Sequence, residues 1–300
     1  MEKKIAVVII TFNGEIWIRK NLNSLLNSVY PIDIIVVDNA STDETIHIIE
    51  EFSAIELIQN KKNLGFGKAN NIGIDLAIKK GADAIFLLNQ DTYVYENTIS
   101  NLAKALFENL NLGIVSPLHY SADEITLDEN FNTYFNRFKK EEDSATIRIV
   151  PFVNAAAWLV STYCISKTGY FDPIFDHYGE DRNFCERVKY HGFSIGVVKN
   201  AAICHDRIVE LSSNKITLQS KYMVLNQMIN CNNSLFTSLF LGLKSVFGLS
   251  KFYFSKQGFI KTVSLCFKLL LYYFNLLLNI RMIIQIRRNS IKGINGVLHL

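Results

Sequence analysis

Four short apolar runs, separated by amphipathic stretches of helical length, open the chain. The runs are Ile5–Ile10, Asp33–Asp38, Ile55–Ile58 and Ala84–Leu88. Their length and their richness in isoleucine and valine are typical of strands buried on both faces of a sheet. The amphipathic stretches are Glu15–Ser28, Thr42–Phe52, Lys68–Lys80 and Glu96–Glu108. Strands that alternate with helices over short connections predict an α/β fold with a mostly parallel central sheet flanked by helices.

Boundary signals and a second α/β stretch complete this prediction. The S-x-x-E pattern of Ser41-Thr42-Asp43-Glu44 predicts a capping box at a helix start. Residues 120–150 are interpreted as a polar insertion. After it we expect a helix from Asp181 to Tyr190, closed by Gly192, and a strand near Ile195–Val198.

Polar side chains follow each of the first four predicted strands, at the point where the strand ends. They are Thr11 and Asn13, then Asp38, then Asn63 and Lys68, then Asn89 and Asp91. Ligands of open α/β sheets bind outside the carboxyl ends of the strands, so we expect one shared cleft. A nucleotide suits it: Asp38 can accept a hydrogen bond from a pyrimidine N–H or a ribose hydroxyl, and Lys68 can meet phosphate. Each loop alone is also compatible with ordinary turn or helix-cap chemistry.

Two further groups of residues carry possible chemistry. Asp91 follows an apolar strand and can hold a hard cation that neutralises a departing diphosphate, or can cap the next helix. His205, beside Asp206, is either structural or a metal ligand. Glu180 and Asp181 open a predicted helix, where they either stabilise the first turn or supply an ionised general base for an acceptor hydroxyl.

The last third of the chain differs in charge and hydropathy. Glu210 is the last acidic residue, and residues 211–300 contain eleven Lys or Arg. Among the mostly apolar runs that follow residue 235, the longest without a charge is Leu269–Ile280, with twelve residues, whereas a transmembrane span needs roughly 20. Extending this run back to residue 262 would place Lys268 inside the bilayer. Insertion of a lysine at that depth costs about 2.5–3.5 kcal/mol. We therefore expect amphipathic helices that lie on a membrane surface over residues 235–290. A buried helical subdomain or oligomer interface, and a true span over 262–280, are the alternatives.

Several classes are excluded. Five widely spaced cysteines without a C-x-x-C pair argue against a disulfide framework and a structural zinc site, and they fit a reducing cytosol. The first apolar run is too short for a secretory signal, so we expect a cytosolic N-terminus. Basic residues are dispersed among apolar ones, so no nucleic-acid partner is expected.

Five motifs in order resemble family 2 glycosyltransferases, in particular bacterial rhamnosyltransferase-like members that build cell-surface polysaccharides. They are VVIITFNG (Val7–Gly14), VVDNASTDET (Val36–Thr45), NLGFGKANNIGI (Asn63–Ile74), LLNQDT (Leu87–Thr92) and FDPIFDHYGEDRNFCERVKYHGF (Phe171–Phe193), and a histidine follows them. The resemblance implies the GT-A fold with its Rossmann-like sheet, a nucleoside-diphosphate-sugar donor, Mg²⁺ or Mn²⁺, and single displacement with inversion.

The resemblance also implies a role for each matching residue. Thr11, Asn13 and Asp38 match nucleoside contacts, and Asn63 and Lys68 match a loop that closes over the nucleotide-sugar. Asp91 matches the final, metal-binding position of a D-x-D signature, and His205 a histidine that completes the metal site in some members. Asp181 matches the general base, with Glu180 towards the acceptor. Two positions depart: Asn89 replaces the first D-x-D carboxylate, and Leu225-Asn226 stands where many relatives carry Arg-Asn.

We therefore expect a catalytic domain over residues 1–220 and a basic, apolar helical extension over 221–300. Within the former, residues 1–118 form the nucleotide-sugar half and 119–220 the acceptor half. The predicted function is transfer of a sugar, with rhamnose as the candidate, to a saccharide or lipid-linked acceptor. The predicted location is the cytoplasm, at the inner face of the cell membrane. An inactive nucleotide-sugar-binding or membrane scaffold is one alternative, which Asn89 favours. Nucleotidyl transfer is another, but Phe12-Asn13-Gly14 replaces the Gly-rich, cationic loop that it requires.

Overall fold

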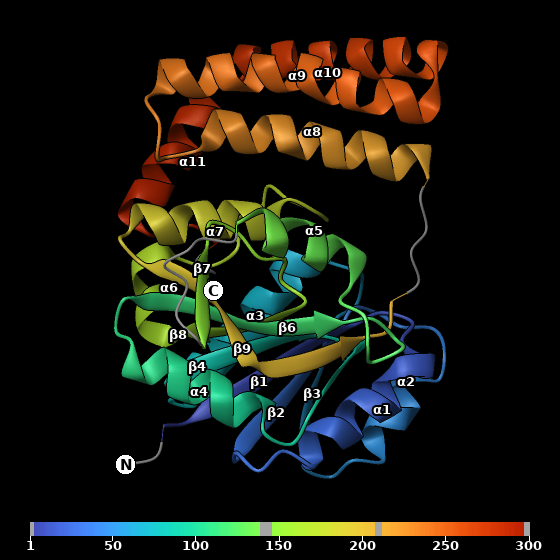
Figure 1. Ribbon diagram of the computed structural model, residues 1–300, viewed down its shortest axis with the longest axis vertical. Coiled ribbons are helices and arrows are strands. Elements are labelled where there is room, and N and C mark those ends of the chain that lie inside the picture. The colour runs from blue at the N-terminus through green and yellow to red at the C-terminus, as the bar shows by residue number, and fades with distance from the viewer. Residues whose placement is uncertain (1–2, 139–145, 208–211, 297–300) are drawn as a thin grey trace.

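The strands form one mixed sheet in the order β3-β2-β1-β4-β8-β6-β9-β5, and β7 pairs with β9 (Figure 1). The computed structural model describes residues 3–138, 146–207 and 212–296. The strands are β1 Ile5–Thr11, β2 Ile32–Asp38, β3 Ile55–Gln59, β4 Ala84–Asn89, β5 Thr92–Val94, β6 Leu112–Tyr120, β7 Ile147–Val150, β8 Ala157–Ser161 and β9 Ser194–His205. The pairs β1–β2, β1–β4, β2–β3 and β6–β9 are parallel. The remaining pairs are antiparallel.

Helices cover both faces of this sheet. They are α1 Glu15–Leu26, α2 Thr45–Glu50, α3 Phe66–Lys79, α4 Thr98–Glu108, α5 Glu129–Arg137, α6 Thr162–Thr168 and α7 Glu180–Tyr190. Alternate side chains of a strand face opposite sides. Val7 therefore packs in the cluster with α1 and α4, whereas Val8 packs in the cluster with α3 and α7. Gly73 brings α3 close to β1, because a Cβ there would lie 2.4 Å from Cγ1 of Val8.

The eight strands and helices predicted in the first 110 residues are confirmed, each boundary within three residues of its expected place, but the short strand β5 was not predicted. The capping box at residues 41–44 is wrong. The Ser41 hydroxyl donates to Asp38 Oδ1 at 2.5 Å, and the helix begins only at Thr45, whose N–H donates to Asp43 Oδ1 at 3.1 Å. A carboxylate is a strong hydrogen-bond acceptor because it is charged. The Ser41 hydroxyl therefore bonds to Asp38 at the end of β2 instead of capping the helix.

The predicted polar insertion is also wrong in part. Residues 129–137 form α5, which Asp128 caps by accepting from the N–H of Phe131 at 2.9 Å. Phe131 and Phe135 face the core from this helix. Strand β7 pairs with the first half of β9, which runs far beyond the expected strand, to His205.

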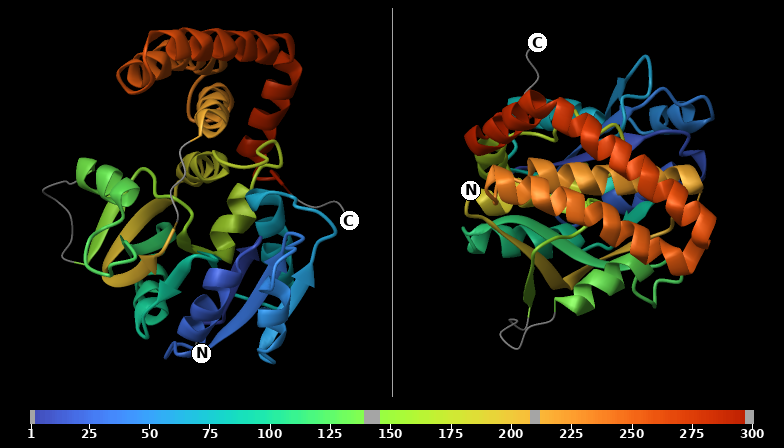
Figure 2. Two further views of the ribbon diagram at one scale, coloured as in Figure 1. Left: turned by 90° about the vertical axis from the view of Figure 1, so that its right-hand side faces the viewer. Right: turned by 90° about the horizontal axis from the view of Figure 1, so that it is seen from above.

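Four helices follow β9, and because the first begins before the expected boundary at residue 221, the C-terminal extension is hereafter these four helices. They are α8 Ser213–Ile229, α9 Leu235–Gln257, α10 Phe259–Leu278 and α11 Ile280–Lys292. Helix α8 lies between α7 and a layer formed by α9 and α10 (Figures 1 and 2). A Cβ on Gly242 of α9 would lie 2.5 Å from Cγ of Met228, so α8 and α9 approach closely there. By length and composition, Leu235–Phe254 and Phe259–Leu278 could each cross a membrane.

The chain returns from α11 to the core through Gly293, Asn295 and Gly296. The N–H of Tyr170 donates to the Asn295 carbonyl at 2.7 Å, and the Asn295 side chain donates to Asp172. Both glycines have positive φ, 66° and 63°. A Cβ on Gly293 would lie 1.9 Å from the Lys167 carbonyl oxygen. This C-terminal clasp, residues 293–296, therefore locks the extension onto the loop that precedes α7.

Candidate functional site

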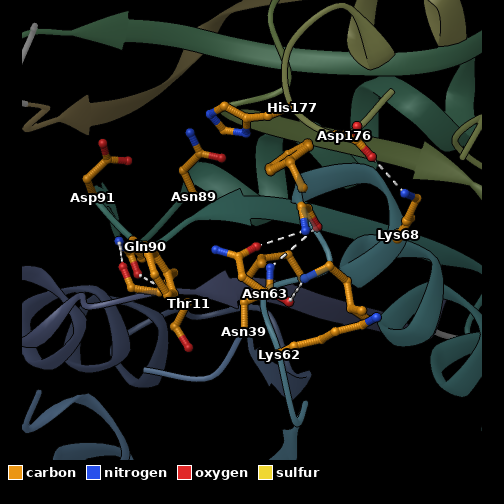
Figure 3. A pocket seen from close by; sticks show the side chains of 15 residues that line it. Thr11, Asn39, Lys62, Asn63, Lys68, Asn89, Gln90, Asp91, Asp176 and His177 are labelled. Atoms are coloured by element: carbon orange, nitrogen blue, oxygen red, sulfur yellow. Dashed lines mark hydrogen bonds and ion pairs between the residues drawn. The ribbon is translucent and has the colours of Figure 1, made fainter. Parts of the chain in front are cut away.

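A cavity of about 820 Å³ opens at the carboxyl ends of β1, β3 and β4 (Figure 3). Five of the predicted site residues line it: Thr11, Asn63, Lys68, Asn89 and Asp91. Phe12, Asn39, Lys62, Gln90, Asp176 and His177 line it as well and were not among the predicted site residues. The expected shared cleft at the strand ends is therefore present.

Asp38 and Asn13 lie behind this wall. Asp38 is 0% exposed, and its carboxylate accepts from the Thr11 hydroxyl at 3.0 Å and from the Ser41 N–H at 2.9 Å. Asn13 has a φ of 47° and accepts from the Thr42 N–H at 2.9 Å. In this structure both side chains organise the loops after β1 and β2, and neither lines the cavity.

Asn39 and Gln90 hold the loops of the cavity together. Asn39 Oδ1 accepts from the Leu64 N–H at 3.3 Å, and its Nδ2 donates to the Gly65 carbonyl at 3.4 Å. Gln90 Oε1 accepts from the Phe12 N–H at 3.0 Å, and Gln90 Nε2 donates to the Phe12 carbonyl at 3.2 Å. The sequence offered one signal for both residues: each stands next to a predicted carboxylate at a strand end.

Asp91 and His205 meet through strand pairing, because β5 pairs Thr92 with His205. Nε2 of His205 lies 3.5 Å from Oδ1 of Asp91, and Nδ1 lies 3.8 Å from Oδ2 of Asp128. Oδ1 of Asp91 and Nδ1 of His205 are buried and have no hydrogen-bond partner among the described residues. The unpaired Nδ1 faces Asp128, whereas the unpaired Asp91 oxygen lies beside Nε2 of the same ring. A buried carboxylate oxygen without a hydrogen-bond partner beside an imidazole nitrogen fits a divalent cation.

The two residues would form only part of a coordination shell. Within the described ranges no group of three or more His, Cys, Asp or Glu is arranged to hold a metal. Mg²⁺ at phosphate sites takes one or two carboxylates and completes its shell with water and substrate phosphates. The fit is therefore to a cation that arrives with a phosphate ligand.

The segment from Phe171 to Glu180 crosses the N-terminus of α3. The carbonyl oxygen of Asp176 would lie 1.8 Å from a Cβ on Gly65, whose φ is +81°. A Cβ on Gly67 would lie 3.7 Å from that of Glu180. Lys68 Nζ forms an ion pair with Asp176 Oδ1 at 2.9 Å, visible in Figure 3. Glycine thus lets the loop before α7 approach the edge of the cavity that carries Lys68.

Glu180 and Asp181 form the first turn of α7. Burial, and then the neighbouring Asp181 charge, raise the pKa of Glu180 to about 8. Burial also raises the pKa of Asp181, against the opposing effects of the Arg182 charge and of the Arg182 N–H, which donates to Asp181 Oδ1 at 2.6 Å. A carboxyl pair with raised pKa values is suited to proton transfer near neutral pH.

The acid pair lines a second cavity, of about 380 Å³, rather than the first. This cavity lies between α7, α8 and α9, and Phe152, Tyr178, Ser220, Met223, Asn226 and Phe252 are among its lining residues. The sequence did not predict that the C-terminal extension would form one wall of a site with the acid pair.

Comparisons with known proteins agree on one family. The family model described as Glycosyl transferase family 2 matches residues 6–167. The dTDP-rhamnosyl transferase RfbF of Shigella flexneri is 26% identical over 230 residues, which cover 73% of this chain and 76% of that protein. The low-salt glycan biosynthesis hexosyltransferase Agl10 of Haloferax volcanii is 23% identical over 247 residues, covering 78% and 76%.

Solved structures share the fold over nearly the whole chain. TarS residues 1–349 of Staphylococcus aureus, in complex with UDP-GlcNAc, superpose with a TM-score of 0.66 at 16% identity, covering 97% of this chain and 91% of that one. A mannosyltransferase of Pyrobaculum calidifontis, in complex with GDP-Man and Mn²⁺, gives 0.64 at 14% identity, covering 98% and 86%. The expected GT-A fold is therefore confirmed.

Proposed function

The chain belongs to glycosyl transferase family 2, and on that premise we propose that it transfers a sugar with inversion from a nucleoside diphosphate to an acceptor hydroxyl. It is a glycosyltransferase that uses a nucleotide-sugar donor. One observation carries the finer proposal. The acid pair of α7 lies against the same α3 terminus whose loop lines the 820 Å³ cavity, so a base and a donor site adjoin each other.

The donor occupies the 820 Å³ cavity. Thr11 contacts the nucleoside, and Asp38 and Asn13 fix that end through Ser41 and Thr42. The sugar diphosphate lies against Asn63, Lys68 and Asn89, and the Lys68 ammonium group supplies positive charge to it. Asp91 and His205 would hold Mg²⁺ or Mn²⁺, which when bound supplies positive charge to the leaving diphosphate. Asn89 contributes no charge, so one carboxylate and one imidazole are the protein's share of this site.

Asp181 is the general base. It takes the proton of the acceptor hydroxyl as that oxygen forms a bond to the anomeric carbon. The bond from that carbon to the phosphate oxygen breaks, and its electron pair leaves with the diphosphate. Attack from the face opposite the leaving group inverts the configuration. Both carboxyls have a raised pKa because of burial, but the Arg182 charge and N–H favour the ionised form of Asp181, whereas the neighbouring Asp181 charge disfavours ionisation of Glu180.

Rhamnose is the proposed sugar, and the similarity to the Shigella flexneri dTDP-rhamnosyl transferase supports it. The proposed acceptor is a saccharide or a lipid-linked saccharide at the inner face of the cell membrane. The catalytic part is proposed to end near residue 220, with residues 221–300 as the extension, although α8 already begins at Ser213.

The outer layer of the extension is proposed to lie on that membrane. Large apolar side chains are exposed along both of its helices: Phe236, Phe240, Phe247, Phe252 and Phe254 of α9, and Phe259, Phe267, Leu271, Phe274 and Leu278 of α10. Lys244, Lys251, Lys261 and Lys268 are exposed among them. Apolar rings and lysines on one layer match an interface with anionic lipid, where lysine heads reach the headgroups.

Nucleoside diphosphate release from a panel of donors, with Mg²⁺ or Mn²⁺ and a membrane lipid extract as acceptor, tests the proposal. We expect release from one donor class, and dTDP-rhamnose in particular, dependent on the metal and the extract. A protein that binds no nucleotide by calorimetry, with or without metal, would instead be the scaffold that Asn89 favours.

A further inference from the structure

Three buried polar atoms of the second cavity have no hydrogen-bond partner among the described residues. They are Oε2 of Glu180, Oγ of Ser220 and Oδ1 of Asn226. Their residues are 6%, 1% and 4% exposed, and all three line the 380 Å³ cavity. An unpaired buried polar group costs roughly 1–3 kcal/mol. Three such groups around one cavity indicate a ligand rich in hydroxyl groups that completes their hydrogen bonds.

The rest of the lining is largely apolar and aromatic. Phe152 comes from the segment before β8, Met223 from α8, and Leu249, Phe252 and Tyr253 from α9. The guanidinium of Arg182 stacks over the Phe152 ring at 4.3 Å. A few placed polar groups within an apolar wall, in a volume of roughly 300–1,000 Å³, are typical of a small-molecule site.

Helix α8 is fixed to the acid pair rather than merely near it. Asn226 Nδ2 donates to the Gly179 carbonyl at 2.9 Å, one residue before Glu180. Gly179 has a φ of +87°, and a Cβ there would lie 3.0 Å from Asn226 Nδ2 and from the Tyr222 Cβ. The remaining amide oxygen of Asn226 therefore keeps a defined place relative to Asp181.

We propose that this cavity binds the sugar ring of the acceptor, and that Ser220 and Asn226 of α8 determine which ring is accepted, with Phe252 of α9 as part of the wall. The proposal rests on the proposed function, because it places the acceptor beside Asp181. The unpaired Oε2 of Glu180 can accept from a sugar hydroxyl, or donate to a sugar oxygen when the carboxyl is protonated, while Ser220 can donate or accept and the Asn226 oxygen accepts. The C-terminal extension thus supplies acceptor specificity in addition to a membrane surface.

The test uses the full-length protein saturated with dTDP and Mg²⁺, in a buffer free of paramagnetic Mn²⁺. It measures binding of n-octyl glycosides of glucose, galactose, N-acetylglucosamine and rhamnose. Saturation-transfer NMR on the ring protons gives each Kd, and n-octanol reports binding of the chain alone. We expect at least one glycoside to bind through its ring. Ser220→Ala should raise the Kd of that glycoside about tenfold, the effect of one lost hydrogen bond of about 1.4 kcal/mol. It should not lower the Tm of the protein.

Two matched controls separate this role from packing and from lipid binding. Ser250 is a buried serine of α9 whose hydroxyl already donates to the Val246 carbonyl at 2.8 Å, so Ser250→Ala should leave the glycoside Kd unchanged. Phe247 and Phe252 are both 54% exposed on α9, but only Phe252 is among the residues that line the cavity. Phe252→Ala should weaken the glycoside several-fold, whereas Phe247→Ala should not.

Failure of this proposal is distinct from failure of the proposed function. If none of the four glycosides binds through its ring, or if Ser220→Ala and Ser250→Ala bind alike, the cavity holds water only and the inference is wrong. Donor binding and nucleoside diphosphate release would be untouched by that result. Conversely, ring binding that depends on Ser220 in a protein that binds no nucleotide would overturn the proposed transfer and keep the sugar site.

Discussion

Nε2 of His205 lies 3.5 Å from Oδ1 of Asp91 at the end of the β5–β9 pair, and Asp128 faces the opposite nitrogen of the ring. The pairing of Thr92 with His205 sets this contact, so two residues 114 positions apart meet beside the 820 Å³ cavity, which Asp91 lines and His205 does not.

Asp91→Asn should abolish Mn²⁺ binding in the presence of nucleoside diphosphate, because it removes the one carboxylate of the site. His205→Ala should weaken Mn²⁺ binding by at least about tenfold, since loss of even an outer-shell partner of a ligand costs 10–100-fold. Electron paramagnetic resonance of free Mn²⁺ measures both. Asp206→Asn is the matched control, since that neighbouring carboxylate accepts instead from the Tyr93 hydroxyl at 2.9 Å. Equal loss in Asp206→Asn would refute the assignment.

Asp181→Asn should lower the transfer rate by at least about a hundredfold, within the range of general base catalysis, and leave donor affinity unchanged. Initial-rate kinetics with separate variation of donor and acceptor measures both. Glu186→Gln, on the same helix and paired with Lys189 at 2.8 Å, controls for a change in helix charge. Turnover of Asp181→Asn within a few-fold of the unmodified enzyme would remove Asp181 as the base.

Glu180→Gln should stabilise the protein increasingly as the pH rises from 5 to 8. The folded-state pKa of Glu180 is raised from 4.5 to about 8, so between these values the folded chain binds a proton that the unfolded chain has released. Stability therefore falls with rising pH through this window, and the glutamine variant does not share that loss. Melting temperatures at pH 5, 6, 7 and 8 test this.

The opposite sign is expected at Glu51, whose pKa is lowered by its hydrogen bond with Arg19. That pair contributes stability above the unfolded pKa and loses it as the pH falls. Glu51→Gln should therefore lower the free energy of unfolding slightly at pH 7 and leave it unchanged in acid.

A constant difference in melting temperature between Glu180→Gln and the unmodified protein across all four pH values would contradict the prediction for the buried Glu180 carboxyl.

Asp176→Asn should tighten nucleoside diphosphate binding by a few-fold, because Lys68 then meets the diphosphate without first leaving its 2.9 Å ion pair. The gain is small, since an exposed pair is worth about 0–1 kcal/mol. Lys68→Ala should weaken binding about tenfold. Calorimetry with the nucleoside diphosphate measures both, and Asp75→Asn, which breaks the separate pair with Lys79, should change nothing. Weaker binding in Asp176→Asn would reverse the interpretation of this contact.

Replacing Lys244, Lys251, Lys261 and Lys268 together by glutamine should reduce sedimentation with anionic vesicles by at least tenfold, at roughly 1 kcal/mol for each lysine near the surface. Neutral vesicles should bind both proteins weakly, and salt should remove the difference. Equal sedimentation of the two proteins at low salt would show that these lysines do not face lipid headgroups.

Local patterns in the sequence were enough to predict the first α/β half. Buried strands rich in isoleucine and valine, such as Ile5–Thr11, have no competing structure, and polar residues after them can only lie at one edge of a parallel sheet. Thr11, Lys68 and Asp91 therefore appear at the cavity where expected.

Contacts between distant segments could not be predicted in the same way. The burial of Asp38 depends on Ser41, whose hydroxyl was assigned to a helix cap instead. The meeting of Asp91 with His205 depends on β9 extending past its apolar centre. The second cavity depends on where α8 crosses α7, which neither helix's own pattern specifies.

The C-terminal clasp has a mechanical consequence. Residues 293–296 fasten the far end of the extension to the loop that carries Asp172, while Asn226 fastens its near end beside Glu180. These two attachments limit how far the extension can move away from α7, so the α9–α10 layer is held at a set distance from the acid pair, whose cavity α9 helps to line. Lipid bound to that layer would then lie at a fixed distance from the acid pair. That distance would set how far a lipid-linked acceptor has to extend from the membrane.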